Sequence, residues 1–155
     1  MTTPQIEKFW AEAKKAVPGL DGAYTVKSFT ANREVSEHLI ERILEGKKFG
    51  TCTLPWLHGR EPGSAPHAGK LIIYTDPDNN PRVLVRQKKP EFVAYGDITD
   101  AHTEVEGEGS AAQKADVWRK IHEPHYKGML EPLGLELGPD MPVAVERFEV
   151  LYPKA

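Results

Sequence analysis

The sequence contains a single cysteine, Cys52, so no disulfide can form within the chain. A disulfide-stapled secreted scaffold is thereby excluded, and a reducing cytoplasm is the expected location. No apolar run approaches the roughly 20 residues that a membrane-spanning helix needs. The first ten residues lack the charged start and apolar block of a secretory signal. We therefore expect a cytoplasmic protein without a membrane partner.

An excess of basic residues is also missing, because the 155 residues carry a formal net charge of −3. This balance argues mildly against tight binding to duplex nucleic acid, which usually needs a basic footprint. The charge is uneven, however, since segment 82–89 is basic and segment 97–109 is acidic. The length and the 39% hydrophobic content suit one globular domain over residues 1–155.

Recognised metal-binding spacings are absent as well. His122 and His125 lie three residues apart, but Pro124 falls between them and disturbs the helical face that they would share. No set of Asp, Glu or Cys residues stands at zinc spacing. We therefore expect no metal ion and no other cofactor.

Hydrophobic periodicity predicts helices and strands in mixed order. Helices are expected over residues 4–16, from Asn32 to just before Gly46, and after a capping box at Ser110 and Gln113. The last of these helices should stop or kink soon after Pro124. Strands are expected at 49–54, 70–76, 81–89 and 142–152, with 24–29 as a strand or an extended arm. This mixture predicts an α+β fold with the strands closed around one core.

Three segments carry candidate chemistry. In GKKFGTCTL, residues 46–54, a desolvated lysine could activate a threonine hydroxyl, although lysines at a helix end are also ordinary solvated charges. In EVEGEG, residues 104–109, Glu106 or Glu108 could act as a general acid, or simply complement a helix dipole. Trp56 opens a Gly/Pro-rich loop and could stack on a base, whereas Trp118 lies on an apolar helix face that suits the core.

Taken in order, several segments resemble the ASCH family, whose fold belongs with the PUA-like β-barrels. GKKFGT (46–51) is similar to the family's G-x-K-x-x-T, and WRKIH (118–122) to its W-R-x-x-H. APHAGKLIIYTD (65–76), EGEG (106–109) and VAVERFEVLY (143–152) stand at matching places. The resemblance covers about residues 29–152 and leaves 1–28 as an N-terminal helix and arm. It implies a PUA-like closed β-barrel with flanking helices.

The resemblance also implies work on RNA or on a modified nucleoside. One branch of the family hydrolyses the acetyl amide of 4-acetylcytidine, and other members are described as ribonucleases or RNA binders. By position, the lysine, threonine and glutamate of that branch fall on Lys48, Thr51 and Glu106. The expectation is a nucleoside- or RNA-binding protein that acts as a metal-independent hydrolase, with a non-catalytic RNA-binding module as the alternative. Further expected substrate contacts are Trp56, Arg60, Tyr95, Glu108, Trp118, Arg119 and His122.

Overall fold

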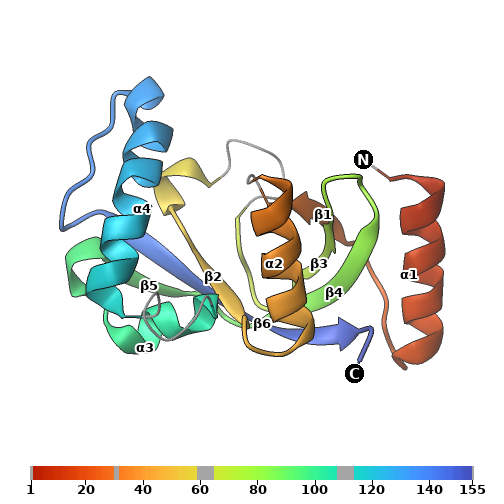
Figure 1. The fold of residues 1–155 in the computed structure, drawn as a ribbon. Helices are drawn as coiled ribbons and strands as arrows, with labels where there is room; N and C mark the ends of the chain where they lie inside the picture. The colour runs from red at the N-terminus through yellow and green to blue at the C-terminus, as the bar shows by residue number, and fades with distance from the viewer. Residues whose placement is uncertain (1, 30–31, 59–64, 108–113, 155) are drawn as a thin grey trace.

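Six strands form one mixed sheet in the computed structural model, which describes residues 2–29, 32–58, 65–107 and 114–154 (Figure 1). The sheet path runs β1-β3-β4-β6-β2, and β5 pairs with β6. β1 and β3 are parallel, and the other pairs are antiparallel. The strands are β1 (Thr25–Ser28), β2 (Gly50–Thr53), β3 (Leu71–Thr75), β4 (Pro81–Gln87), β5 (Glu91–Ala94) and β6 (Pro142–Tyr152).

The long strand β6 joins the two parts of the sheet. Its first half pairs with β2 and β5, and its second half pairs with β4. Residues 143–146 are buried in succession, because both faces of this half are covered. The predicted strand at 142–152 is confirmed, but its first half does not show the alternating exposure of a half-buried strand.

The sheet curls without closing. Within the described residues, no pairing joins β1 to β2, the two ends of the sheet path. Register shifts between Tyr74 and Thr75 and between Leu84 and Val85 interrupt the ladders, as bulges do where a sheet bends. The α+β class is therefore observed, whereas the closed barrel implied by the resemblance is replaced by an open, curled sheet.

Two capped helices flank the β3–β4 hairpin (Figure 1). Helix α1 (Pro4–Ala16) begins at Thr3, whose side chain accepts a hydrogen bond from the Ile6 amide. Helix α2 (Arg33–Leu44) begins at Asn32, and Gly46 follows it with a φ of +78°. These starts and stops match the sequence prediction, because caps are local signals.

Neighbouring residues of β3 contact different helices. Ile73 packs in one apolar cluster with Ile6 of α1, and Ile72 packs in another with Ile43 of α2. Successive side chains of a strand point to opposite faces of a sheet, so the two helices cover opposite faces. This explains why all five residues of β3 are buried.

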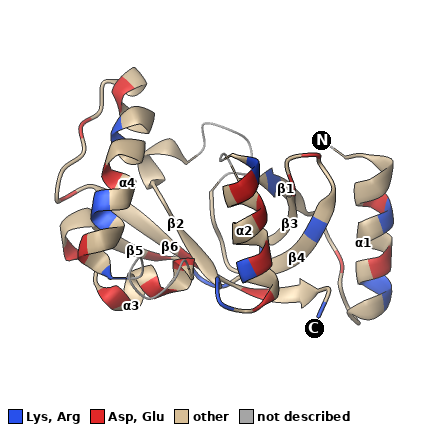
Figure 2. Cartoon of the chain, viewed as in Figure 1, with Lys and Arg blue, Asp and Glu red and all other residues tan. Residues whose placement is uncertain are grey.

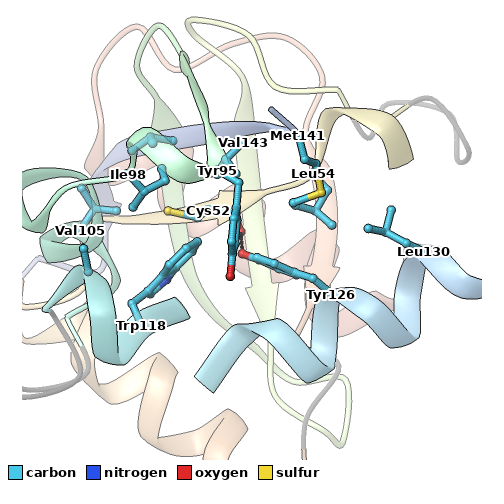
Figure 3. Close-up of a cluster of buried hydrophobic side chains, with 12 residues drawn as sticks. Cys52, Leu54, Tyr95, Ile98, Val105, Trp118, Tyr126, Leu130, Met141 and Val143 are labelled. Atoms are coloured by element: carbon cyan, nitrogen blue, oxygen red, sulfur yellow. Dashed lines mark hydrogen bonds between the residues drawn. The ribbon is translucent and has the colours of Figure 1, made fainter. Parts of the chain in front are cut away.

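Helix α4 (Ala115–Leu130) packs against the other end of the sheet. It does not stop at Pro124 but continues to Leu130, so of the predicted stop or kink the stop is not observed at this residue. Figure 3 shows Trp118, Tyr126 and Leu130 of this helix beside Cys52 and Leu54 of the β2 region. The predicted capping box at Ser110 and Gln113 lies outside the described residues.

Two short elements were not predicted, namely β5 and helix α3 (Asp100–Thr103). Helix α3 leads into a 3-10 turn at Glu104–Glu106, which reaches back to the start of β2. None of the described helices combines the length and the apolar character needed to cross a membrane.

Candidate functional site

A cavity of about 440 Å³ opens beside strand β2. Its walls are β2 with the preceding Lys48, the segment around His58, the end of the turn at Glu106, and the side of α4 that carries His122 and Tyr126. Its volume lies within the roughly 300–1,000 Å³ typical of small-molecule sites. The wall mixes apolar and aromatic side chains with a few polar groups, as such sites usually do.

Lys48 and Glu106 form a buried ion pair at the base of this cavity. The Lys48 Nζ donates to Glu106 Oε2 at 2.8 Å and to the Gly50 carbonyl at 2.7 Å. Lys48 is 2% exposed and Glu106 is 5% exposed. Charged residues are almost never this buried unless they are paired, so the two side chains depend on each other.

The pair also satisfies the free edge of β2. The carbonyl of Gly50 and both backbone groups of Cys52 point away from β6, toward the cavity side. Glu106 Oε1 accepts from the Cys52 amide at 2.8 Å. The Tyr126 hydroxyl donates to the Cys52 carbonyl at 3.3 Å, a contact drawn in Figure 3. Unpaired backbone groups at a strand edge are costly when buried, and here side chains from two other elements satisfy them.

Burial raises the pKa of the Glu106 carboxyl, but other contributions outweigh it. The charge of Lys48, the hydrogen bond from its ammonium and the bond from the Cys52 amide together hold the pKa of Glu106 below its ordinary value of 4.5. At neutral pH the group is therefore a carboxylate that faces an ammonium.

Two glycines allow the turn that carries Glu106 to approach β2. A Cβ on Gly107, whose φ is +63°, would lie 2.2 Å from the Lys47 carbonyl oxygen. A Cβ on Gly50 would lie 2.9 Å from the Val105 Cβ. The Phe49 amide donates to the Val105 carbonyl at 2.9 Å across this contact. Gly50, just before Thr51, and Gly107, just after Glu106, are therefore needed for the two segments to touch.

Thr51 lies on β2 next to this pair and lines the same cavity. The sulfur of the neighbouring Cys52 is an unsuitable nucleophile, because burial and then the charge of Glu106 raise the pKa of its thiol well above the ordinary value. A hydroxyl group is thus the better candidate for covalent chemistry at this point of β2. The structure brings Lys48, Thr51 and Glu106, the three positions that the family resemblance singled out, to one cavity.

A second polar group adjoins the cavity and was not found from the sequence. Thr53 Oγ1 donates a short hydrogen bond to Glu146 Oε2 of β6 and lies 2.8 Å from His58 Nε2. Gln87 Nε2 donates to the other carboxylate oxygen, Glu146 Oε1, at 2.6 Å. The available signal was Glu146 itself, a charged residue directly after the apolar run 142–145, because buried charges need partners.

The other expected substrate contacts have different positions. His122 lines the cavity, and its Nδ1 lies 2.9 Å from the Trp118 carbonyl. Trp118 and Tyr95 belong to the buried apolar cluster, and the Arg119 guanidinium donates to the carbonyls of Tyr95, Gly96 and Ile98. These three residues therefore support the wall from behind.

Trp56 is 39% exposed and is not part of the cavity wall. Arg60 and Glu108 lie outside the described residues. Across the part of the chain that the structure describes, no three His, Cys, Asp or Glu residues gather as a metal site would require.

The curled sheet and the cavity beside β2 define an α+β protein with a polar, ligand-sized site. The ASCH domain model matches residues 25–152, which is most of the chain. The chain therefore belongs to the ASCH domain family. None of the curated proteins matches its sequence.

Two crystal structures share the fold. The ASCH domain from Lactobacillus crispatus JV V101 is 20% identical, with a TM-score of 0.87 over 98% of this chain and 97% of that chain. A protein from Enterococcus faecalis V583 is 26% identical, with a TM-score of 0.80 over 94% of this chain and 87% of that chain. The likeness therefore extends beyond the matched domain to the N-terminal helix.

Proposed function

We propose that this protein binds a nucleoside, free or within single-stranded RNA, in the cavity beside β2 and hydrolyses an acyl amide on its base, as in 4-acetylcytidine. One observation carries the proposal. Lys48, Thr51 and Glu106 line one cavity of about 440 Å³, and two of them form a buried ion pair. Covalent catalysis commonly uses a nucleophile beside a base that a third group orients, and Thr51, Lys48 and Glu106 could fill these three roles.

The resting pair is an ammonium and a carboxylate. In the first step, Lys48 passes a proton to Glu106, the neutral amine so formed takes the proton of the Thr51 hydroxyl, and the Thr51 oxygen attacks the acyl carbon. The C–N bond then breaks, and Glu106 gives its proton to the leaving amino nitrogen, which restores the ammonium and the carboxylate. Water next cleaves the Thr51 ester and releases the carboxylic acid.

The charge distribution favours a small ligand over a long nucleic-acid strand. Lys and Arg residues are interspersed with Asp and Glu along α1, α2 and α4 (Figure 2). Tight, sequence-independent binding of RNA depends on a stripe of positive charge that neutralises phosphates. Affinity for this protein should therefore come mainly from the base and sugar inside the cavity.

A non-catalytic RNA-binding module is the second candidate, and one observation favours it. Lys48, Glu106 and Tyr126 together satisfy backbone groups at the free edge of β2. The ion pair thus has a structural reason to exist without any turnover. In that case the cavity would hold a base, and no bond would be broken.

The test is to incubate the purified protein with 4-acetylcytidine and, separately, with unstructured single-stranded RNA, and to separate the products by chromatography. Release of acetate and cytidine by the wild type, lost in Thr51→Val and retained in part in Thr51→Ser, is the expected result. Valine keeps the shape of threonine but removes the nucleophile, so circular dichroism should show an unchanged fold. Full turnover of 4-acetylcytidine by Thr51→Val would refute the assignment of Thr51 as the nucleophile. Salt-sensitive RNA binding without any product would favour the binding module, and cleavage of RNA would indicate a ribonuclease.

A further inference from the structure

The polar group beside the cavity contains a directed chain of hydrogen bonds. Gln87 Nε2 and Thr53 Oγ1 donate to the two carboxylate oxygens of Glu146, and Thr53 Oγ1 also lies in hydrogen-bond contact with His58 Nε2. Glu146 and Gln87 are each 2% exposed, so bulk water does not replace these bonds. Gln87 and Thr53 both donate to the buried carboxylate of Glu146. Their donation fixes the direction of the remaining hydrogen bond, between Thr53 and His58.

Counting hydrogens assigns the tautomer of His58. A threonine hydroxyl has one hydrogen, and Thr53 uses it for Glu146 Oε2. Thr53 Oγ1 can therefore only accept at its 2.8 Å contact with His58 Nε2. The hydrogen of that contact must sit on His58 Nε2, and in a neutral imidazole the other nitrogen, Nδ1, then carries a lone pair.

We propose that His58 is a specificity-determining residue of the cavity, whose Nδ1 accepts a hydrogen bond from the exocyclic amino or amide N–H of a cytosine base. His58 lines the cavity, and its anchor Thr53 lies two residues beyond Thr51 on β2. Side chains two positions apart share one face of a strand, roughly 7 Å apart along it. A base that presents its N4 substituent to Thr51 would thus lie within reach of His58. The inference rests on the proposed function, because it assigns the residue that recognises the exocyclic N–H of the base in the same cavity.

The charges around His58 keep it in the neutral form that this role requires. Burial lowers the pKa of His58, Glu146 of β6 raises it, and Lys27 of β1 and Lys70 before β3 lower it again, with a net result below 6.5. A uracil base offers a carbonyl where cytosine offers an N–H, and that carbonyl would face the Nδ1 lone pair. The cavity should therefore prefer cytidine to uridine at neutral pH. The preference should shrink as the pH falls through the pKa of His58, because Nδ1 then becomes a donor.

The first experiment uses the free protein labelled with ¹⁵N at histidine, and reads the tautomer of His58 by NMR. We expect the Nε2–H tautomer in the wild type and in Thr53→Ser, and a loss of that preference in Thr53→Val, which has no hydroxyl. A merely structural role for Thr53 would not change the tautomer. An Nδ1–H tautomer in the wild type would overturn the inference directly, without any ligand.

The second experiment measures the dissociation constants of cytidine and uridine by calorimetry. We expect the wild type to favour cytidine by about five- to tenfold, the range that one lost hydrogen bond to an uncharged group corresponds to. His58→Phe should abolish this ratio, and His67→Phe, on an exposed loop residue, should leave it unchanged.

The two proposals fail in different ways. The role of His58 would be refuted by an unchanged cytidine preference in His58→Phe, or by equal affinities of the wild type for cytidine and uridine. Amide hydrolysis could still be observed in either case. A wild type that neither binds a nucleoside nor turns over 4-acetylcytidine would remove the proposed function, and the role of His58 with it.

Discussion

Lys48 Nζ lies 2.8 Å from Glu106 Oε2, although the two residues are 58 positions apart in the sequence. Both side chains are buried, so neither charge has water to replace its partner. A buried ion pair adds little net stability compared with apolar residues, yet breaking it by removing one partner is expensive. The pair therefore holds the Glu104–Glu106 turn against β2 at the point where the cavity opens.

The first prediction concerns the two partners of this pair. Lys48→Met should lower the free energy of unfolding by roughly 3–5 kcal/mol, because Glu106 is left buried and unpaired. The double variant Lys48→Met/Glu106→Leu should be less destabilised than the sum of the two single variants. Urea denaturation of all four proteins measures this coupling.

Lys47→Met is the matched control for that experiment. Lys47 is the neighbouring lysine, and within the described residues it forms an exposed ion pair with Glu45. Its removal should leave the urea midpoint unchanged. Strictly additive effects of Lys48→Met and Glu106→Leu would contradict a direct interaction between the two side chains.

A second prediction tests the close approach that positions Glu106. Gly107→Ala should cost about 3 kcal/mol, because the new Cβ meets the Lys47 backbone and the φ of +63° disfavours any side chain. Gly46→Ala is the control, since its φ is +78° but nothing lies within 4 Å of the new Cβ. The free energy of unfolding of Gly46→Ala should fall only by the cost of a side chain at positive φ, about 1 kcal/mol. Equal losses in thermal or urea unfolding would show that the contact with Lys47 is unimportant.

The helices and the long strands could be read from the sequence because their signals are local. Thr3 and Asn32 cap α1 and α2 as expected, and the alternation at 142–152 marked β6. The short strand β5 was missed because four residues carry too weak a pattern. Its existence depends on pairing with β6, whose paired residues lie 48 to 54 positions further along the chain. The opening between β1 and β2 is likewise a property of the whole sheet and of no single segment.

The residues of the candidate site likewise fall into those that could be predicted from the sequence and those that could not. Lys48, Thr51 and Glu106 stand in short segments that resemble a family pattern, so they could be named in advance. Thr53, His58 and Glu146 come together only through the register that sets Thr53 opposite Ala144 and through the path of the chain after β2. No spacing in the sequence encodes that register. Trp118 shows the converse, because a residue within a family motif lies in the apolar core.

The third prediction concerns acid stability. The pKa of Glu106 is lower in the folded protein than the ordinary 4.5, so folding favours the carboxylate. This contribution to stability is present above the unfolded pKa and is lost as the pH falls through the folded pKa. Urea midpoints between pH 7 and pH 3 should therefore fall less steeply on the acid side for Glu106→Gln than for the wild type.

Lys48→Met should change the dependence of stability on pH in the opposite direction, so that mild acid stabilises the variant. Without the ammonium, burial becomes the dominant influence, and the pKa of Glu106 should rise above its ordinary value. A group with a raised pKa in the folded state stabilises the fold only where it is protonated. The variant should therefore gain stability on mild acidification, where the wild type does not. A profile parallel to that of the wild type would mean that Lys48 does not control the charge of Glu106.

The last prediction concerns the edge of β2, where Glu106 and Tyr126 bond to the two backbone groups of Cys52. Tyr126→Phe removes only the hydroxyl, and we expect a loss of about 1 kcal/mol in the free energy of unfolding. Because both contacts hold the backbone of the same residue, Cys52, Tyr126→Phe and Glu106→Gln should be non-additive by about 0.5 kcal/mol or more. Tyr24→Phe is the control, since that hydroxyl makes an exposed contact with Thr2 and should matter little. Additive effects at Tyr126 and Glu106 would contradict a coupling between the two contacts. An unchanged stability of Tyr126→Phe would mean that the edge of β2 tolerates an open carbonyl, and the structural explanation for the buried pair would lose support.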